Sequence, residues 1–522
     1  MDTKNPARVD PGVPSAPEPG ARVTGSALAG VIAAAMVIGV AELVAAVMSP
    51  AAAPFVALGA TVVDYTPEAL RKFAIEQFGT RDKQALFVSM ALVMAVLAVG
   101  IGLLERRRPW GSVCLGLLGV AVAAVVLQRP NAEVTDAIPT LIGVVAGIVT
   151  LRVLIARAPR SGETTGDVSR RRFLMLAGGA AVLAAGAAAT GQWLGERLRA
   201  ITADRANFRL PTPRVAAPMP PPGTDPPVPG LTPFVTANDR FYRIDTALRI
   251  PAVTRADWRL RIHGRVGRPV ELTMDDLDEL TAMDKTITLT CVSNEVGGDL
   301  AGNAVWTGYS LAELLAMAGV EPEADMLLSR SADGFTAGTP IAAITDGRDA
   351  LLAVGMNGEP LPLQHGYPAR LVVPGLYGFV SATKWVVDLE LTRFDEARAY
   401  WTERGWAERA PIKVASRIDV PGAFADLTAG PTMVAGVAWA QQRGIALVEV
   451  QVDDGPWAPA RLVPEYSADT WRQWTWQWDA PPGPHTLRVR ATDATGQRQT
   501  DQRTRPIPDG ATGWHSVVVT VT

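Results

Sequence analysis

The chain has 522 residues, a formal net charge of −3 and a hydrophobic fraction of 48%. At about 150 residues per domain this length allows three or four domains, and the balanced charge excludes a globally basic nucleic-acid-binding protein. Its two cysteines, Cys114 and Cys291, exclude a disulfide scaffold and a cysteine-rich zinc or iron–sulfur site.

The first 200 residues are rich in Ala, Val, Leu and Gly and hold the apolar runs. A membrane span needs about 20 apolar residues. After a tail at residues 1–24, a transmembrane region over residues 25–195 is predicted to contain five helices, at residues 25–48, 85–104, 110–127, 138–155 and 173–193. The run at residues 51–63 is too short to span, so we expect it to be interfacial or re-entrant.

The distribution of Lys and Arg predicts the orientation, because these residues accumulate on the cytoplasmic side. With five spans, one set of flanks carries twelve Lys and Arg and the other carries five. The N-terminal tail is therefore predicted to be cytoplasmic, and everything after residue 195 extracytoplasmic. The stretch Ser169–Leu174 (SRRRFL) resembles a twin-arginine export signal, with a positive-inside flank as the alternative. Whether this fifth segment is cleaved stays open.

Two further features concern the membrane region. Glu42 lies within the first run, where an ionisable side chain is a functional hypothesis, the alternative being a carboxyl group that faces other helices. All four histidines lie at or after residue 263, which excludes a bis-histidine haem in the membrane. We therefore expect no haem in this chain, and an external electron-transfer partner.

The rest of the chain has the composition of an ordinary soluble protein. Residues 196–233 are proline-rich and predict an extended, semi-rigid linker that holds the next domain off the membrane. Strand and helix patterns then mix, which predicts an α+β domain over residues 234–400. Its expected strands lie at residues 258–266, 286–290, 369–373 and 384–391. Its expected short helices lie at residues 273–280, with Thr273 as the N-cap, and at residues 310–317.

From residue 410 to residue 522 the pattern is all-β. Alternating segments lie at residues 434–439, 445–452, 471–478, 485–492 and 515–522. Strands at this spacing, separated by Gly- and Pro-rich turns, predict an immunoglobulin-like sandwich.

Cys291 ends a predicted strand and begins a loop that is rich in Gly and Asn. Three interpretations are open. A strand-end cysteine is commonly a small buried hydrophobe, and with His365 as partner it would serve a cysteine–histidine hydrolase. As a thiolate it would ligate a redox-active transition metal, which prefers soft sulfur. The loop composition favours the metal, because glycine allows backbone to approach a ligand closely.

A series of short motifs begins at this cysteine. They are Cys291 with Asn294, Trp306-Thr307-Gly308 with Leu311, Gly358–Pro362, His365–Arg370, Val373–Gly375 and Lys384-Trp385. In order and spacing they resemble the molybdopterin-binding domain of the sulfite oxidase family, and the C-terminal sandwich resembles that family's dimerisation domain. The resemblance covers about residues 231–522. It implies a molybdenum–molybdopterin cofactor, a molybdopterin-dependent oxidoreductase and a homodimer formed through the C-terminal domain.

The resemblance also implies roles for single residues. Cys291 would be the thiolate ligand of molybdenum, with Asn294 beside it and Tyr377 as a second catalytic residue. The residues implied to bind the pterin and its phosphate are Asn238, Tyr242, Arg243, Ser329 or Ser331, His365, Arg370, Ser381, Thr383 and Lys384. Tyr377, Phe379 and Trp306 are expected to line the substrate pocket.

Two departures from the family bear on the substrate. Sulfite oxidases resemble one another in carrying arginines where this chain has Ala237 and Val296. Because a desolvated dianion must be paired with positive charge, oxygen-atom transfer to or from a sulfoxide or N-oxide is expected rather than sulfite oxidation. A sulfite oxidase or dehydrogenase is the alternative, and a non-catalytic, cofactor-binding membrane sensor or scaffold is the alternative of another class.

Overall fold

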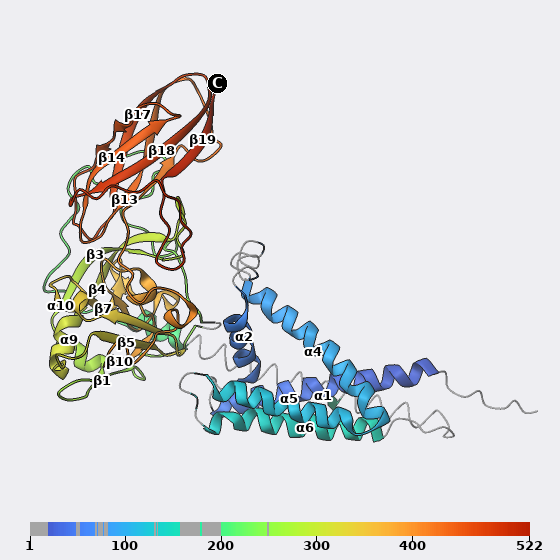
Figure 1. Ribbon diagram of the computed structural model, residues 1–522. Coiled ribbons are helices and arrows are strands. Elements are labelled where there is room, and N and C mark those ends of the chain that lie inside the picture. The colour runs from blue at the N-terminus through green and yellow to red at the C-terminus, as the bar shows by residue number, and fades with distance from the viewer. Residues whose placement is uncertain are drawn as a thin grey trace, which may run out of the picture. The chain divides into compact units, whose positions relative to one another are not determined.

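The computed structural model describes residues 19–48, 53–67, 70, 77, 82–129, 132, 134–156, 178–179, 200–247 and 250–522. The chain divides into two compact units, Met1–Arg197 and Leu198–Thr522, here called unit 1 and unit 2 (Figure 1).

Unit 1 is helical. Its described helices are α1 (Pro19–Met48), α2 (Pro54–Tyr65), α4 (Asp82–Arg107), α5 (Trp110–Leu127) and α6 (Ile138–Ala156), with a 3₁₀ turn η3 (Val134–Ala137) before α6. Within the described residues, α1, α4, α5 and α6 are long and apolar enough to cross a membrane, which confirms four of the predicted runs as helices. The short run forms α2, of 12 residues. The fifth run and the SRRRFL stretch lie outside the described residues, apart from residues 178 and 179.

Small residues bring the long helices of unit 1 into close contact. A Cβ on Gly30 of α1 would lie 1.9 Å from the carbonyl oxygen of Ala98 in α4, and a Cβ on Gly143 of α6 would lie 2.4 Å from that of Val37 in α1. In a bilayer, where water does not drive helices together, such close backbone packing is a main source of association.

Polar side chains join the helices near their ends. The Glu105 carboxylate of α4 accepts hydrogen bonds from the backbone N–H and the hydroxyl of Ser112 in α5, both at 2.6 Å. The Nε of Arg152 in α6 donates to the same hydroxyl at 3.1 Å. Asp64 of α2 pairs with Arg129 at 2.8 Å. The two less exposed carboxylates, Glu105 and Asp64, therefore each have polar partners, as charged groups among apolar helices require.

The first domain of unit 2 contains two β-sheets, one antiparallel and one mixed, in which β1 pairs with β10 in parallel. One has the order β3–β4–β7–β8, with β9 paired to β7, and consists of β3 (Ala282–Thr290), β4 (Ala301–Ser310), β7 (Leu351–Met356), β8 (Glu359–Pro360) and β9 (Arg370–Val372). The other has the order β2–β1–β10–β5–β6 and consists of β1 (Arg259–Gly264), β2 (Val270–Thr273), β5 (Met326–Ser331), β6 (Thr336–Pro340) and β10 (Val386–Thr392). The predicted α+β class is confirmed.

Short helices connect these strands. They are α8 (Met274–Asp278), α9 (Leu311–Ala318), α10 (Ala342–Thr345) and the 3₁₀ turns η4 (Leu363–His365), η5 (Gly378–Val380) and η6 (Thr402–Arg404). Thr273 begins α8 with the predicted cap, its hydroxyl accepting from the backbone N–H of Asp276. Ser310 caps α9 in the same way through Glu313. These caps satisfy backbone N–H groups that have no partner inside a helix.

The C-terminal domain is an all-β sandwich of two sheets, with strand orders β11–β13–β17–β16 and β12–β19–β18–β14–β15. Its strands are β11 (Ala415–Val420), β12 (Asp426–Leu427), β13 (Gly430–Trp439), β14 (Ile445–Val452), β15 (Ala458–Pro459), β16 (Arg461–Leu462), β17 (Arg472–Ala480), β18 (Gly483–Asp493) and β19 (His515–Val521). Side chains that alternate along β18 and β19 pack between the sheets. The predicted strands are therefore present.

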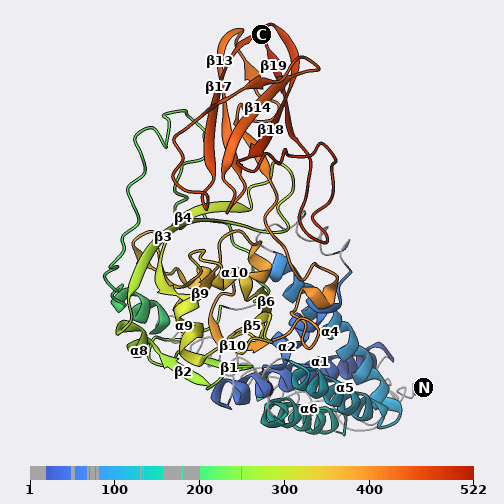
Figure 2. The same cartoon turned by 60° about the vertical axis from the view of Figure 1, so that its left-hand side comes forward.

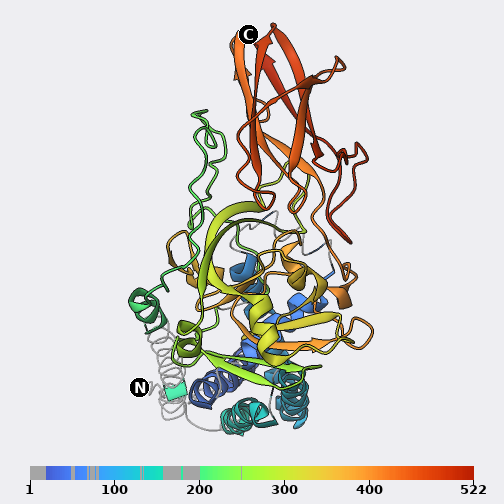
Figure 3. The same ribbon diagram turned by 90° about the vertical axis from the view of Figure 1, so that its left-hand side faces the viewer.

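The segment between the two units differs from the expected linker. Residues 200–207 are helical, and residues 208–233 are extended but packed along unit 2. The Arg214 N–H donates to Ala282 O at 2.9 Å, and Asp225 accepts from Gln473 of the sandwich at 2.9 Å. Figure 3 shows this green segment rising from its helix toward the sandwich. It is therefore part of unit 2 rather than a spacer that stands free of it.

The core of the first domain extends to Val437, Trp439 and Trp471 of the sandwich, which also has a core of its own, and a buried polar network joins the two domains. In Figure 2, β3 and β4 lie between the sandwich and the sheet that contains β1 and β10. The Thr288 hydroxyl of β3 donates to Asn303 of β4 at 3.0 Å and accepts from the backbone N–H of Trp471 at 2.8 Å. The Trp471 indole N–H donates to Phe234 O at 2.9 Å. Thr288 thereby links β3 to β4 and to the sandwich, and these contacts position the loop that follows β3.

Candidate active site

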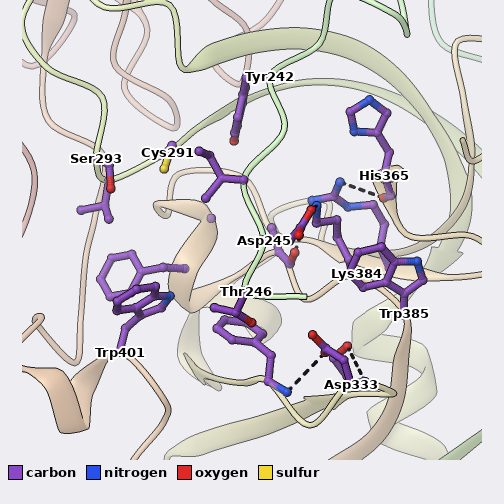
Figure 4. A pocket seen from close by; sticks show the side chains of 18 of the residues that line it. Tyr242, Asp245, Thr246, Cys291, Ser293, Asp333, His365, Lys384, Trp385 and Trp401 are labelled. Atoms are coloured by element: carbon purple, nitrogen blue, oxygen red, sulfur yellow. Dashed lines mark hydrogen bonds and ion pairs between the residues drawn. The ribbon is translucent and has the colours of Figure 1, made fainter. Parts of the chain in front are cut away.

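A cavity of about 930 Å³, including the space at its mouth, opens beside the end of β3 (Figure 4). Cys291 lies in its wall immediately after β3, and the rest of the wall comes from the segment 241–246, residues 331–335 and the loops around η4, η5 and η6. In Figure 4, Cys291, Ser293 and Trp401 occupy one side of the cavity, and His365, Lys384 and Trp385 the other. The cavity therefore has two chemically different ends.

The Cys291 loop is closed by its own hydrogen bonds. The Cys291 N–H donates to Leu300 O at 2.9 Å, and the Asn294 N–H donates to Cys291 O at 3.1 Å. The side-chain oxygen of Asn294 accepts from the Leu300 N–H at 2.9 Å. Burial raises the pKa of the thiol, while hydrogen bonds from Ser293 oppose that rise. Asn294 thus shapes the loop from behind and does not line the cavity.

Two buried cations mark the opposite end. Arg370 begins β9, is 5% exposed and donates to His365 O at 3.0 Å and Ala382 O at 3.3 Å. Within residues 200–247 and 250–522, no carboxylate pairs with it. Lys384 donates to Asp245 at 2.9 Å and to Gln364 O at 3.0 Å. Burial lowers the pKa of Arg370 to about 10 and that of Lys384 to about 8, so both charges are held at a desolvation cost that a bound anion would offset.

His365 lies between these cations and the Asn238–Tyr242 segment. Burial and the charges of Arg370 and Lys384 lower its pKa to about 4, so the imidazole is neutral at pH 7. Its Nε2 lies 3.1 Å from Asn238 O. Because a carbonyl oxygen only accepts, Nε2 carries the proton and Nδ1 is left as an acceptor.

The structure places six of the predicted site residues in this cavity: Tyr242, Cys291, Ser331, His365, Arg370 and Lys384. Burial raises the pKa of Tyr242 far above its ordinary value, which keeps the phenol protonated. The other predicted binding residues lie behind or beside the wall. Asn238 bonds to Glu359 at 2.6 Å, and Arg243 pairs with Asp245 at 2.9 Å.

Three predicted serine and threonine residues are fully buried supports of the wall. The Ser329 hydroxyl bonds to the Thr383 hydroxyl at 2.8 Å, and that of Ser381 donates to Tyr377 O at 3.0 Å. Of the two serines proposed for one pterin contact, Ser331 is therefore the one that reaches the cavity.

Tyr377 and Val296 line a different cavity, of about 390 Å³, between the two domains of unit 2. Tyr377 is buried, and burial raises its pKa to about 12. A Cβ added at Gly510 would lie 2.5 Å from the Tyr377 hydroxyl oxygen, so this hydroxyl packs against Gly510 of the C-terminal domain. The structure thus does not bring Tyr377 to the cavity of Cys291. Neither Val296 nor Ala237 lines that cavity either.

Sequence reasoning missed several side chains of the main cavity. Trp401 and Trp406 lie around η6, in a stretch that carried no motif, and Ser293, Asp333 and Phe335 also contribute. The available signal was the pair of tryptophans five residues apart, just before the C-terminal domain.

Comparisons with known proteins match this part of the chain. The model of the oxidoreductase molybdopterin binding domain matches residues 247–401. The chain is 28% identical to human mitochondrial sulfite oxidase over 303 residues, which is 49% of this chain and 55% of that protein. It is 30% identical over 152 residues to the uncharacterized oxidoreductase YuiH of Bacillus subtilis, covering 29% of this chain and 73% of YuiH.

The chain belongs to the sulfite oxidase family of molybdopterin-dependent oxidoreductases. It is also 29% identical over 289 residues to the NADH nitrate reductase of Ulva prolifera, covering 44% of this chain and 33% of that protein. The chain spans about half the length of the sulfite oxidases it matches. The family's cofactor is molybdenum–molybdopterin, as the sequence predicted.

The side chains of the cavity fit that cofactor. Cys291 offers one soft sulfur, and among the described residues no three His, Cys, Asp or Glu side chains come together as a metal site. The metal therefore has to bring further ligands with it, as a dithiolene-bearing pterin does. The Arg370 side chain is buried and has no carboxylate partner within residues 200–247 and 250–522, and Lys384 lies beside it. Arg370 therefore has the charge and fork geometry that bind a phosphate.

Proposed function

We propose that this chain is a membrane-anchored, extracytoplasmic molybdenum oxidoreductase that acts by two-electron oxygen-atom transfer on a neutral sulfoxide or N-oxide in preference to sulfite. The supporting observation is the distribution of charge around Cys291. The cations of its cavity, Arg370 and Lys384, gather at the end suited to the pterin phosphate, whereas Ser293, Phe379 and Trp401 are uncharged.

The second cavity, which Tyr377 and Val296 line, has no Lys or Arg among its described lining residues that could pair with a sulfite dianion. Val296 stands where the sulfite oxidases carry an arginine, and among the described residues that line this cavity Glu295 is the charged one. A carboxylate repels an oxyanion, and a desolvated oxyanion without a cation is strongly disfavoured. A neutral oxide carries no net charge to be desolvated, so it can approach Cys291 without an arginine.

The chain's own side chains hold and orient the cofactor. Cys291 would bind molybdenum through Sγ, and Arg370 and Lys384 would neutralise the phosphate of the pterin. Neutral His365 would offer Nδ1 to a donor on the pterin, since its Nε2 is committed to Asn238 O. When bound, molybdenum–molybdopterin supplies the two-electron redox centre that oxygen-atom transfer requires.

The overall reduction balances with an external electron carrier. The S–O or N–O bond breaks, two electrons come from that carrier, and two protons accompany the oxygen as it leaves as water. The names of the relatives include both an oxidase of sulfite and a reductase of nitrate, so family membership is compatible with either direction. The four apolar helices of unit 1 support the proposed anchor, and a homodimer through residues 410–522 is part of the same proposal.

Steady-state kinetics tests this function. The full-length protein in detergent, with molybdenum content measured on the same sample, is assayed for sulfite oxidation with ferricyanide and for sulfoxide and N-oxide reduction with reduced viologen. We expect kcat/KM for an oxide to exceed that for sulfite. Efficient sulfite oxidation with a micromolar KM would establish the alternative, and absence of any turnover in a cofactor-loaded sample would favour a sensor or scaffold.

A further inference from the structure

One wall of the main cavity is built of aromatic rings. Phe379, Trp401 and Trp406 all line it. The ring centroids of Phe379 and Trp406 are 5.7 Å apart, and those of Trp406 and Trp401 are 6.1 Å apart. None of the three is fully buried, so their faces and edges provide an apolar surface that is accessible from the cavity.

The loops that carry these rings are held from behind. Tyr400 packs edge-on against Trp401 at 5.0 Å and beside Phe335 at 5.7 Å, and the Arg404 guanidinium stacks 3.6 Å from the Tyr400 ring. The backbone N–H of Trp406 donates to the backbone carbonyl oxygen of Trp401 at 3.1 Å, and this hydrogen bond closes the turn around η6. The aromatic wall is therefore preformed rather than a set of loose side chains, and preformed sites bind at a lower entropic cost.

This wall lies next to the reactive end of the cavity. A Cβ on Gly378, the residue before Phe379, would lie 3.9 Å from Thr290 O and 3.8 Å from the Tyr242 hydroxyl. Thr290 directly precedes Cys291. In Figure 4, Trp401 lies on the same side of the cavity as Cys291, and Lys384 lies on the other side. A phosphate held at Lys384 would therefore lie across the cavity from Trp401.

We infer that this wall seats an aryl group of the substrate, which makes the preferred substrates aryl sulfoxides or heteroaromatic N-oxides rather than small aliphatic oxides. This inference rests on the proposed oxide reduction. Aromatic pairs in offset or edge-to-face contact stabilise one another beyond the area they bury. An aryl group on the oxide would complete the row of rings while its S–O or N–O group points toward Cys291. Phe379, Trp401 and Trp406 are then specificity-determining residues.

The experiment compares two oxides that differ in one substituent. Dimethyl sulfoxide and methyl phenyl sulfoxide are assayed with reduced viologen on full-length wild type, Trp401→Ala, Trp406→Ala and Trp401→Phe. Trp457→Ala is the matched control, since that tryptophan packs on Trp514 in the sandwich at 4.8 Å and lies outside the cavity. Molybdenum and pterin contents are measured on every sample.

We expect wild type to prefer the aryl sulfoxide by about tenfold or more in kcat/KM, mainly through KM. Each alanine variant should lose most of that preference, mainly through a higher KM for methyl phenyl sulfoxide, whereas Trp401→Phe and the Trp457→Ala control should retain it. Equal kcat/KM for both oxides, or an unchanged preference in the alanine variants, overturns the inference and leaves oxide reduction standing. Loss of pterin in the alanine variants also overturns it, since the wall would then hold the cofactor. Failure to reduce either oxide refutes the proposed function itself.

Discussion

Replacing Arg370 with glutamine separates binding of the phosphate from support of the fold. Arg370 is 5% exposed, and among the described residues its guanidinium donates to the carbonyl oxygens of His365, Leu371 and Ala382 and stacks 5.0 Å from the Trp306 ring. Since those contacts are to neutral groups, the substitution leaves no carboxylate unpaired. We therefore expect Arg370→Gln to weaken cofactor binding much more than it weakens the fold.

The expected loss follows from the hydrogen bonds that the guanidinium can make. A charge-assisted hydrogen bond contributes about 1.5–3 kcal/mol, and a guanidinium can make two to one phosphate. Losing both corresponds to about 3–6 kcal/mol, or roughly a hundred- to ten-thousandfold weaker binding. In the cofactor-free protein, losing the carbonyl contacts is offset by removing a desolvated charge, so the free energy of unfolding should change by only about 1 kcal/mol.

The assay measures molybdopterin per folded protein, and unfolding in urea followed by tryptophan fluorescence. Of the 14 tryptophans, 12 follow residue 200, so the fluorescence reports mainly on unit 2. Arg443→Gln is the control. Arg443 pairs with the fully buried Asp493 at 2.7 Å, so its loss should cost about 3 kcal/mol of stability while cofactor content per folded protein stays unchanged.

Two results would refute the reasoning. Full retention of the cofactor in Arg370→Gln would mean that another group binds the phosphate. A loss of stability as large as that of Arg443→Gln would mean that Arg370 is a structural residue.

Three further predictions concern the thiolate, the orientation and the buried lysine. Cys291→Ser should abolish turnover while the urea midpoint stays close to wild type, because an oxygen ligand does not reproduce the metal–sulfur bond; wild-type turnover would remove Cys291 from the metal. In a Cys114→Ser background, Pro220→Cys should react with an impermeant thiol reagent in intact cells, whereas labelling only after lysis would mean that the orientation is inverted. Burial holds the pKa of Lys384 at about 8 instead of 10.5, so the unfolded chain binds more protons between these values and the unfolding free energy of the cofactor-free protein should rise across that window. That rise should be smaller in Lys384→Met, and identical pH profiles would contradict it.

Helices and strands whose pattern lies within a single segment could be predicted from the sequence. The run at residues 110–127 forms α5 and the alternation at residues 445–452 forms β14, both with the predicted bounds. Apolar length and a two-residue period are properties of a single segment, so no partner is needed to recognise them. The cap at Thr273 is equally local.

Two central strands that are buried on both faces, β4 and β7, escaped prediction. β7 is buried at all six positions, and eight of the ten residues of β4 are buried. Such strands show no alternation of polar and apolar residues, because the second face is covered by another layer of the fold. Their order in the sheet, β3–β4–β7, depends on contacts far apart in the chain.

The candidate site likewise has features that the sequence predicts and features that only the tertiary structure determines. The order and spacing of the motifs, through the family resemblance that they carry, predicted Cys291, His365, Arg370 and Lys384 as site residues, and the structure places these four side chains in one cavity. Which face of a loop reaches the cavity was decided only by tertiary packing. Tyr377 faces Gly510 of the C-terminal domain, and Trp401 reaches the cavity because its turn is closed through Trp406. Residue identity therefore determined the chemistry available to this protein, whereas contacts between distant loops determined which side chains surround the thiolate.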